Sequence, residues 1–401
     1  MVLRKKRSLN VKKVLLALLL LVVMFGSAFL FIKDKDFFKG KPNNSDIEEE
    51  EKEPEEEKPK EYSLDMIMVG DVLIHSLVYR DAKVGDTYNF MPMFENIKDT
   101  IAEHDLAFCN METPFGGKEL GYSGYPTFNT PHEIGDNLID LGFNLFSLAT
   151  NHTMDKGAKG AINSLNYWNS KENILTAGSY LSEEARKEVR IREKNNIKYT
   201  MLAYLGTWTN HALPSNQQYL LNMYDKEKVK ADIERVRDEV DLLIVSMHWG
   251  QEYKLEPNAK QREMAEYLAS LGVDIIIGHH THSVQPIEYI GNTLVFYSLG
   301  NFISNQPNYD DLIGLMPTLK VTKTVDKDNN VTMQISDVEA NLIYTAYDGT
   351  RCELCYHSNY RIIPFGQLTP EILPQYKTYY DKYKTVLTSL DPDIVVGPID
   401  E

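Results

Sequence analysis

The sequence has 401 residues and a net charge of −16, with 43% hydrophobic and 25% charged residues. This composition is typical of a globular protein and excludes a chain that is disordered throughout. The acidic balance argues against nucleic acid as a partner, because proteins that bind the phosphate backbone need clustered positive charge.

The N-terminal part differs in composition from the rest of the chain. A basic segment at residues 1–13 precedes an uncharged apolar run at residues 14–32. A helix over this run would be roughly 28 Å long, about one hydrocarbon core, and basic flanks stay on the cytoplasmic side. We therefore predict a single-pass anchor in the cell membrane, with a cytoplasmic N-terminus and an extracytoplasmic body. A cleaved signal peptide is the alternative, since Gly26, Ser27 and Ala28 are small.

The residues after the apolar run predict a stalk followed by the folded body. Residues 33–61 are charged and contain the acidic blocks Glu48–Glu51 and Glu55–Glu57, which repel one another and stay extended. We assign residues 62–320 to the main domain and residues 321–401 to a C-terminal extension made of a β-hairpin and a helix.

Short apolar runs and stretches of helical periodicity alternate along the main domain. The predicted strands are Leu64–Val69, Leu106–Cys109, Leu145–Ala149, Leu242–Met247 and Val273–Ile277. The predicted helices are Phe94–Glu103, Glu133–Leu141, Lys226–Val240 and Ala259–Leu271. This alternation predicts an α/β architecture with substantial parallel pairing. In the extension, we expect Leu319–Val325 to pair with Val331–Ser336, and a helix at Pro374–Leu390.

Three cysteines are few for an exported protein. Cys352 and Cys355 are close enough in sequence to form a small disulfide, and two free thiols are the alternative. Cys109 lies within an apolar run and is expected in the core.

Polar side chains follow the five predicted strands of the main domain at their carboxyl ends. In open α/β sheets, ligands bind at this edge. The residues are Asp71, Glu112, Asn151, His152, His248, His279, His280 and His282. Carboxylate, amide oxygen and imidazole together suit Mn, Fe or Zn better than calcium or a structural zinc. We therefore predict a site for one or two metal ions, and two ions could share one carboxylate.

Each of these residues also has a structural interpretation. Aspartates such as Asp71 often cap helix N-termini, and an isolated histidine on a strand, such as His248, is often a core residue. The cluster from His279 to His282 is harder to explain by packing, because it places three imidazoles within four residues. It favours a metal or anion site.

Six motifs occur in an order that resembles a known family. They are Gly70–Asp71, Asn110–Pro114, Ala149–His152 with Asp155, His248–Gly250 with Glu252 and Tyr253, Gly278–His282, and Tyr297–Phe302. The chain resembles the CapA family of bacterial capsule-synthesis proteins, also called PgsA and associated with poly-γ-glutamate. That family is similar to the calcineurin-like metallophosphoesterases. The resemblance implies a two-sheet β-sandwich flanked by helices, with metal ligands on loops at strand ends.

The resemblance also implies a role for individual residues. The implied metal ligands are Asp71, Glu112, Asn151, His248, His280 and His282. The implied catalytic residues are His152, which protonates a leaving group or steadies phosphoryl oxygens, and Asp155, which orients it. The candidates for supporting positions around the site are His75, His279, Glu252 and Tyr253.

Two positions depart from the metallophosphoesterase pattern. Leu73 stands where a ligand histidine is usual, and Glu112 stands where an aspartate is usual. The first change favours a site that only grips polymer carboxylates through a metal. The presence of Asn151 and His152 favours chemistry instead, because metal binding alone needs no catalytic imidazole.

The N-terminal residues predict a membrane-anchored extracytoplasmic protein, and the resemblance implies that it acts in capsule or poly-γ-glutamate production. Its role would be export, assembly or anchoring of the anionic polymer, beside the membrane components of a polymer synthase. The alternative is a surface metal-dependent hydrolase that cleaves a phosphodiester or a polymer and is not dedicated to capsule.

Overall fold

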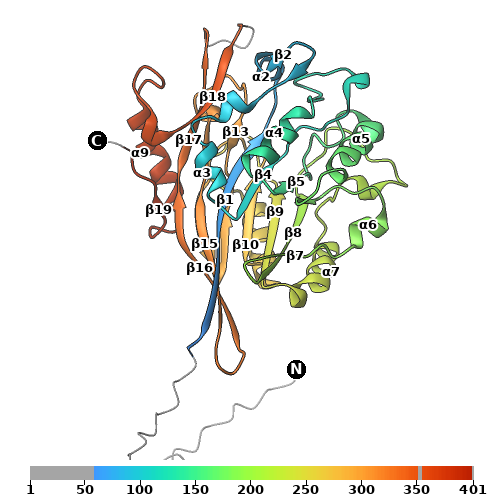
Figure 1. Cartoon of the computed structure of the whole chain (residues 1–401), viewed down its shortest axis with the longest axis vertical. Coiled ribbons are helices and arrows are strands. Elements are labelled where there is room, and N and C mark those ends of the chain that lie inside the picture. The colour runs from blue at the N-terminus through green and yellow to red at the C-terminus, as the bar shows by residue number, and fades with distance from the viewer. Residues whose placement is uncertain (1–57, 351–354, 400–401) are drawn as a thin grey trace, which may run out of the picture. The chain divides into compact units, whose positions relative to one another are not determined.

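The computed structural model describes residues 58–350 and 355–399 (Figure 1). The predicted cytoplasmic segment, the membrane anchor, most of the stalk and Cys352 lie outside these residues. Within the described ranges, no helix is both long enough and apolar enough to span a membrane.

The first sheet carries the strands that begin the main domain. Its hydrogen-bonded order is β19-β16-β15-β1-β4-β5-β6, and β13 pairs with the end of β1. The strands are β1 (Lys60–Val72), β4 (Leu106–Asn110), β5 (Leu145–Ser147), β6 (Leu175–Ala177), β13 (Asn301–Ile303), β15 (Thr318–Val325), β16 (Val331–Ala340) and β19 (Val395–Val396). Neighbours from β1 to β6 are parallel, as the alternation of strands and helices predicted.

The second sheet contains the later strands of the main domain, in the order β11-β12-β10-β9-β8-β7. The strands are β7 (Arg192–Lys194), β8 (Ile197–Leu205), β9 (Leu242–His248), β10 (Ile275–His279), β11 (Ile287–Ile290) and β12 (Thr293–Phe296). The pairs β8–β9, β9–β10 and β10–β12 are parallel, so their carboxyl ends lie at one edge of the sheet.

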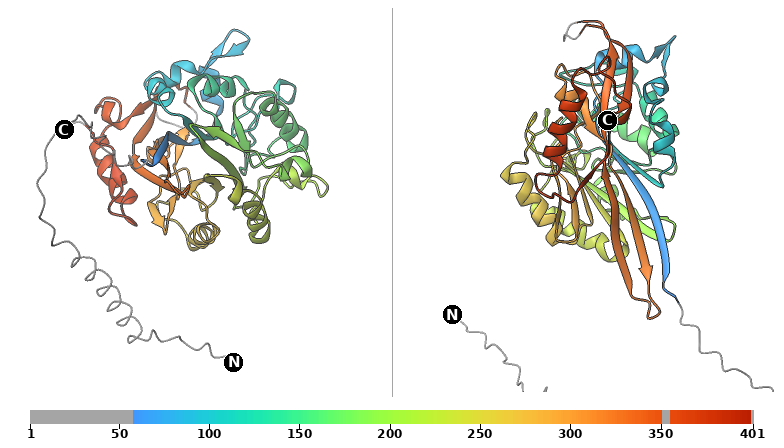
Figure 2. Two further views of the ribbon diagram at one scale, coloured as in Figure 1. Left: turned by 60° about the horizontal axis from the view of Figure 1, so that its bottom comes forward. Right: turned by 90° about the vertical axis from the view of Figure 1, so that its left-hand side faces the viewer.

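The two sheets pack face to face, and helices cover their outer sides (Figure 2). Strand β9 shows the arrangement, because Leu242 and Ile244 belong to the main core whereas Leu243 and Val245 pack with the helices behind it. A hydrogen bond of 2.9 Å between the Oγ atoms of Ser147 and Ser246 joins the sheets directly. The predicted two-sheet α/β sandwich is therefore confirmed.

Helices α7 (Lys226–Val236) and α8 (Ala259–Ser270) contribute to the core behind the second sheet. Helices α3 (Lys98–Ala102), α4 (Glu133–Leu141) and α5 (Gly157–Asn169) pack against the first sheet. Helix α8 begins with a capping box between Asn258 and Gln261, which satisfies backbone N–H groups that a helix start leaves free.

Two predicted helices are shorter than their apolar periodicity suggested. The prediction at Phe94–Glu103 is wrong in its first part, where a 3-10 turn η1 (Met91–Phe94) is followed by α3 only from Lys98. Asn96 lies between them and donates to the Ile362 carbonyl 3.1 Å away, so a tertiary contact replaces a helical turn. Beyond α7, the chain tightens into η4 (Arg237–Glu239).

The C-terminal part confirms the predicted hairpin, since β15 and β16 are antiparallel. Strand β15 crosses residue 320 and pairs with β1 from Lys60 to Ile67, so this hairpin belongs to the first sheet rather than to a separate extension.

The third sheet has the order β14-β17-β18, with β14 (Ile313–Leu315), β17 (Leu342–Asp348) and β18 (Ser358–Pro364). Helix α9 (Tyr376–Leu387) falls inside the predicted range.

The remaining short elements lie in the connections. They are α2 (Ser76–Asp81), α6 (Glu183–Lys187), β2 (Lys83–Val84), β3 (Thr87–Tyr88), η2 (Lys118–Leu120), η3 (Gln218–Leu220), η5 (Asp310–Leu312) and η6 (Phe365–Gln367). Cys355 is disulfide-bonded, whereas Cys109 is free and buried in the core, as predicted.

Candidate metal centre

The carboxyl ends of five strands bring the predicted polar residues to one place. Strands β1, β4 and β5 of the first sheet and β9 and β10 of the second all end there. The residues are Asp71 in β1, Glu112 after β4, Asn151 and His152 after β5, His248 at the end of β9, and His279, His280 and His282 at and after the end of β10. All of them are less than a tenth exposed.

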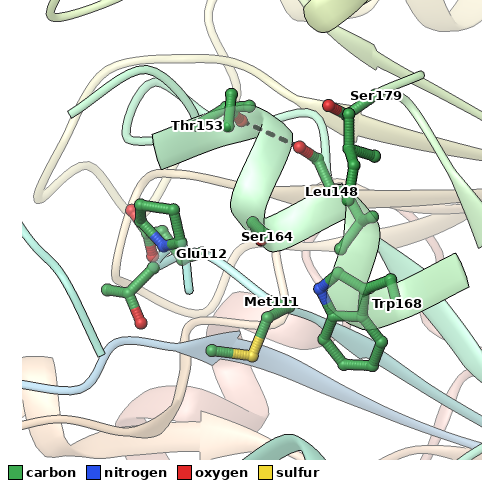
Figure 3. Close-up of a pocket in the computed structure, with 11 residues that line it drawn as sticks. Met111, Glu112, Leu148, Thr153, Ser164, Trp168 and Ser179 are labelled. Atoms are coloured by element: carbon green, nitrogen blue, oxygen red, sulfur yellow. Dashed lines mark hydrogen bonds between the residues drawn. The ribbon is translucent and has the colours of Figure 1, made fainter. Parts of the chain in front are cut away.

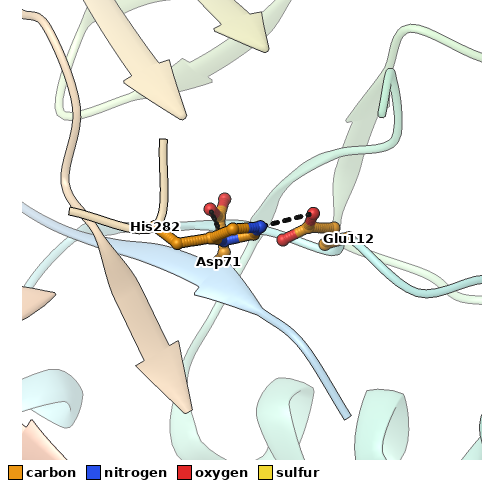
Figure 4. Close-up of side chains that lie close together, drawn as sticks. All are labelled: Asp71, Glu112 and His282. Carbon is orange, nitrogen blue, oxygen red and sulfur yellow. Dashed lines mark ion pairs between the residues drawn. The ribbon is translucent and has the colours of Figure 1, made fainter. Parts of the chain in front are cut away.

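Asp71, Glu112 and His282 form a first group of candidate ligands (Figure 4). One ligand atom from each lies within 4.8 Å of the others. His282 Nδ1 is 3.2 Å from Asp71 Oδ2, and His282 Nε2 is 3.8 Å from Glu112 Oε1. The His282 ring thus lies between the two carboxylates.

Asn151, His248 and His280 form a second group, which is connected through His248. His248 Nε2 is 2.9 Å from Asn151 Oδ1 and 3.8 Å from Glu112 Oε1. The rings of His248 and His280 have their centroids 4.8 Å apart. Glu112 therefore lies within reach of both groups, which is the position of a carboxylate shared by two ions.

Several polar atoms of the centre are buried without a hydrogen-bond partner. They include both carboxylate oxygens of Glu112 and Nδ1 of His280. A buried polar atom without a partner costs about 1–3 kcal/mol, and native proteins leave few of them. A divalent cation would satisfy exactly such oxygen and nitrogen lone pairs, so the residues present fit a metal ion.

The pKa values of the candidate ligands are consistent with metal binding. Burial and the nearby Asp71 carboxylate raise the pKa of Glu112 well above its usual range. Burial also opposes a charge on His282, but Glu112 and Asp71 outweigh it and raise the pKa of His282 to about 10. Burial lowers the pKa of His280 to about 3 and that of His248 well below its usual range. These two imidazoles are therefore neutral, which is the form that binds a cation.

His152 and Asp155 lie beside the candidate ligands as a hydrogen-bonded pair. His152 Nδ1 is 2.7 Å from Asp155 Oδ2, which also accepts the Phe128 N–H at 2.7 Å. Asn210 Nδ2 donates to Asp155 Oδ1 at 3.3 Å and lies 2.9 Å from His152 Nδ1. With the Nδ1 proton directed at Asp155, Nε2 of His152 is left for a reacting group.

The four supporting candidates differ in their contacts. His75 Nδ1 is 3.1 Å from the Leu73 carbonyl and 3.2 Å from the Asn305 amide nitrogen, so the backbone engages it. His279 stacks on Phe108, and its Nδ1 is 3.6 Å from Asp71 Oδ1. The ring of Tyr253 is 6.0 Å from that of His282. Glu252 acts through its charge, since it adds to the upward pKa shift of Glu112.

Leu73 is 2% exposed and packed in the interior. It therefore supplies no ligand at the position where the metallophosphoesterase pattern has a histidine. Among the described residues, His75 is not part of the group formed by Asp71, Glu112 and His282, so no observation places it at that position.

Sequence reasoning did not single out two asparagines of the centre, Asn110 and Asn301. Asn110 Nδ2 donates to Asp71 Oδ1 at 2.8 Å, and Asn301 Oδ1 is 3.0 Å from His282 Nδ1. Asn110 and Asn301 stand in two of the six motifs, which was the available signal. Their amides could not be assigned a contact before the strands were paired.

A small cavity of about 20 Å³ adjoins Glu112 (Figure 3). Its lining includes Thr153, Ser164, Trp168 and Ser179, and Nε1 of Trp168 has no hydrogen-bond partner. This volume is enough for about one water molecule.

The family model of the bacterial capsule synthesis protein PGA_cap matches residues 65–306. That range includes every candidate ligand and the His152–Asp155 pair. The chain belongs to the PGA_cap family. The resemblance noted from the six motifs is therefore confirmed.

Among the relatives of this PGA_cap protein are two curated CapA proteins. The PGA biosynthesis protein CapA of Bacillus subtilis (strain 168) is 29% identical over 270 residues, which are 62% of this chain and 66% of the relative. The capsule biosynthesis protein CapA of Bacillus anthracis is 25% identical over 252 residues, which are 61% of this chain and 60% of the relative. The match thus spans less than two thirds of either relative.

A solved structure with similarity to the chain is that of a protein assigned as a 5'-nucleotidase from Staphylococcus aureus. It has a TM-score of 0.41 and 14% sequence identity, and the match covers 80% of this chain and 58% of that one.

Proposed function

We propose that this PGA_cap protein is a metal-dependent hydrolase of the capsule polymer pathway, which cleaves a phosphoester or an amide bond at the cell envelope. The observation that carries the proposal is the buried group of Asp71, Glu112 and His282, with Asn151, His248 and His280 near it, beside a hydrogen-bonded His152–Asp155 pair. Metal binding alone would account for the ligands. It would not account for an oriented imidazole next to them.

The residues divide into two half-sites around one carboxylate. Asp71 and His282 would hold one ion, Asn151, His248 and His280 would hold the other, and Glu112 would face both. Imidazole, amide and carboxylate ligands suit Mn, Fe or Zn. A bound ion would supply Lewis acidity that polarises a phosphoryl or carbonyl oxygen of the substrate.

The protein's own part in proton transfer falls to His152. Asp155 accepts a hydrogen bond from the Nδ1–H of His152 and so holds the ring in one orientation. The Phe128 N–H and the Asn210 amide donate to Asp155 in turn. His152 Nε2 can then deliver a proton to a leaving group. Asp155 acts through His152 and is a positioning residue.

Two variants of the full chain test the proposal. His152→Ala should lower hydrolysis of a phosphodiester or of poly-γ-glutamate about 10²- to 10⁴-fold, because general acid catalysis contributes that much. Its metal content should stay at the wild-type level. The double variant Asp71→Ala and His280→Ala should lose the metal.

His132→Ala is the matched control, because the side chain of His132 is 51% exposed and its ion-pair contact is with Glu133. Full activity in the His152→Ala chain would remove His152 from the mechanism. A wild-type chain that takes up neither Mn, Fe nor Zn would overturn the proposal as a whole.

The buried Leu73 favours a second candidate function, in which the metal grips carboxylates of the polymer without turnover. A missing ligand at that position weakens one half-site. Metal-dependent retention of poly-γ-glutamate by a wild-type chain that cleaves neither substrate would support this function over the first.

We further propose that the chain is anchored in the cell membrane by residues 14–32 and that the body acts outside the cytoplasm on an anionic polymer such as poly-γ-glutamate. The uncharged run and its basic flank support this location. Its partners would be the membrane components of the polymer synthase. An acidic chain repels an acidic polymer, so a bound metal would be the point of attachment between them.

A further inference from the structure

We propose that Asn301 is a positioning residue that sets the tautomer of His282 and thereby makes Nε2 its metal-binding atom. The inference rests on the proposed metal centre and concerns a residue that the ligand set does not include.

The backbone places Asn301 beside Asp71. Strands β1 and β13 are parallel, and their register pairs Asp71 with Asn301. Two acceptors therefore face the same ring nitrogen, since His282 Nδ1 is 3.0 Å from Asn301 Oδ1 and 3.2 Å from Asp71 Oδ2. A nitrogen that faces two acceptors carries the proton.

The orientation of the Asn301 amide is determined by its other contacts. Its Nδ2 donates to the Asp311 carbonyl at 2.7 Å and to Gln306 Oε1 at 2.6 Å. A backbone carbonyl can only accept, so the amide nitrogen must lie on that side. The amide oxygen then has to face His282.

The contacts continue outward from the centre. Gln306 Nε2 donates to the hydroxyl of Tyr253 at 3.1 Å, and the Tyr253 ring lies beside His282. Asn301 itself is fully buried, so water does not replace its oxygen readily.

The consequence for metal binding follows from the two acceptors. With the proton on Nδ1, the lone pair of His282 is on Nε2, the atom that is 3.8 Å from Glu112 Oε1. Asp71 would be drawn to the metal as a ligand itself. Asn301 then remains as the acceptor dedicated to His282, and such partners commonly contribute 10- to 100-fold to metal affinity.

The first test measures the affinity of the full chain for Zn²⁺ and Mn²⁺ by competition with a chromogenic chelator. Asn301→Leu keeps the size of the side chain and removes the acceptor, and we expect about 10- to 100-fold weaker binding. Asn222→Leu is the matched control, because Asn222 is also buried but donates to the Ala203 carbonyl. It loses a contact to Ala203 rather than to a candidate ligand, so its affinity should stay within about twofold of wild type, below the loss of about 10-fold or more expected for a ligand partner.

Binding by Asn301→Leu within about twofold of wild type would overturn the role of Asn301 and leave the proposed metal centre in place. A wild-type chain that binds neither ion would instead contradict the metal centre itself. The two failures are therefore distinguishable.

The second test needs no folded variant at position 301. The wild-type full chain is labelled with isotopic histidine nitrogen and loaded with NMR-active cadmium, and His282→Gln identifies the signals of His282. We expect coupling between cadmium and Nε2 of His282, with the proton on Nδ1. Coupling to Nδ1 would contradict the inference.

Discussion

Glu112 is the single residue on which both groups of candidate ligands depend. Its side chain is fully buried, both of its oxygens lack a hydrogen-bond partner, and Oε1 lies 3.8 Å from Nε2 of His248 and of His282. Burial next to Asp71 raises the pKa of Glu112, so the ionised form is costly, and His282 offsets that cost only in part when no metal is bound. The Glu112 carboxylate therefore destabilises the metal-free protein, and a bound metal ion would remove that cost.

This leads to opposite expectations for the two states of a Glu112→Gln variant. Without metal, the neutral amide should unfold at or above the temperature of wild type, because it removes a buried carboxylate. With Zn²⁺ or Mn²⁺ at about 100 times the wild-type Kd, wild type should gain about 2.7 kcal/mol of stability and the variant much less. Thermal unfolding with chelator and with metal measures both. Equal metal-induced gains in the two proteins would mean that Glu112 is not a ligand.

The ends of the strands place the candidate ligands, and two glycines in these strands allow neighbouring backbone segments to come close together. A Cβ at Gly278 in β10 would lie 2.0 Å from the Tyr297 carbonyl oxygen, and one at Gly70 in β1 would lie 1.9 Å from that of Gly300. No side chain fits at either position. Because β10 leads directly into His280 and His282, its alignment sets where these imidazoles lie.

Gly278→Ala should therefore push β10 away from the chain at Tyr297 and displace the two imidazoles. We expect a loss of about 1–3 kcal/mol in the free energy of unfolding, as for overpacking, together with weaker metal binding. Gly366→Ala is the matched control, because a Cβ there would meet the Pro398 carbonyl oxygen at 3.6 Å, an ordinary contact. Urea unfolding and chelator competition give the two readouts. A Gly278→Ala chain as stable as the Gly366→Ala chain would show that the strands can separate without cost.

For the molecule as a whole, the proposed location decides which substrates the centre can meet. The chain is acidic, with a net charge of −16, and the family to which it belongs is that of capsule synthesis proteins. An anionic polymer at the envelope would be repelled by such a chain at long range, although salt screens this beyond about 10 Å. Attachment at the membrane would keep the body close to the polymer where it is made.

The proposed anchor predicts how the full chain partitions when cells are fractionated. It should stay with the membranes during an alkaline wash, because an apolar span inserts essentially irreversibly. External protease should reach the body in intact protoplasts. Replacing residues 14–32 with a cleavable signal peptide should release the body into the medium. A wild-type chain found in the medium with its N-terminus beyond residue 28 would instead establish a cleaved signal peptide.

Much of the architecture was predictable because hydrophobic periodicity is a local property of the chain. Helix α4 has the predicted bounds, and the five strands of the main domain lie within a few residues of their predictions. The residue types of the candidate ligands were also predictable, since carboxylates and imidazoles that directly follow apolar strands stand out in the sequence. Local pattern failed at Phe94–Glu103, where a contact from Asn96 to the distant Ile362 carbonyl interrupts the helix.

The sequence by itself determined the fold class, the family and the chemical types that gather at the strand ends. Only the tertiary structure decided which atoms meet. Asn301 contacts His282 because β13 pairs with β1, and Asn210 contacts His152 from a loop 58 residues away. Contacts of this kind depend on strand register and on the packing of one sheet against the other. Neither is encoded in the residues next to the contact.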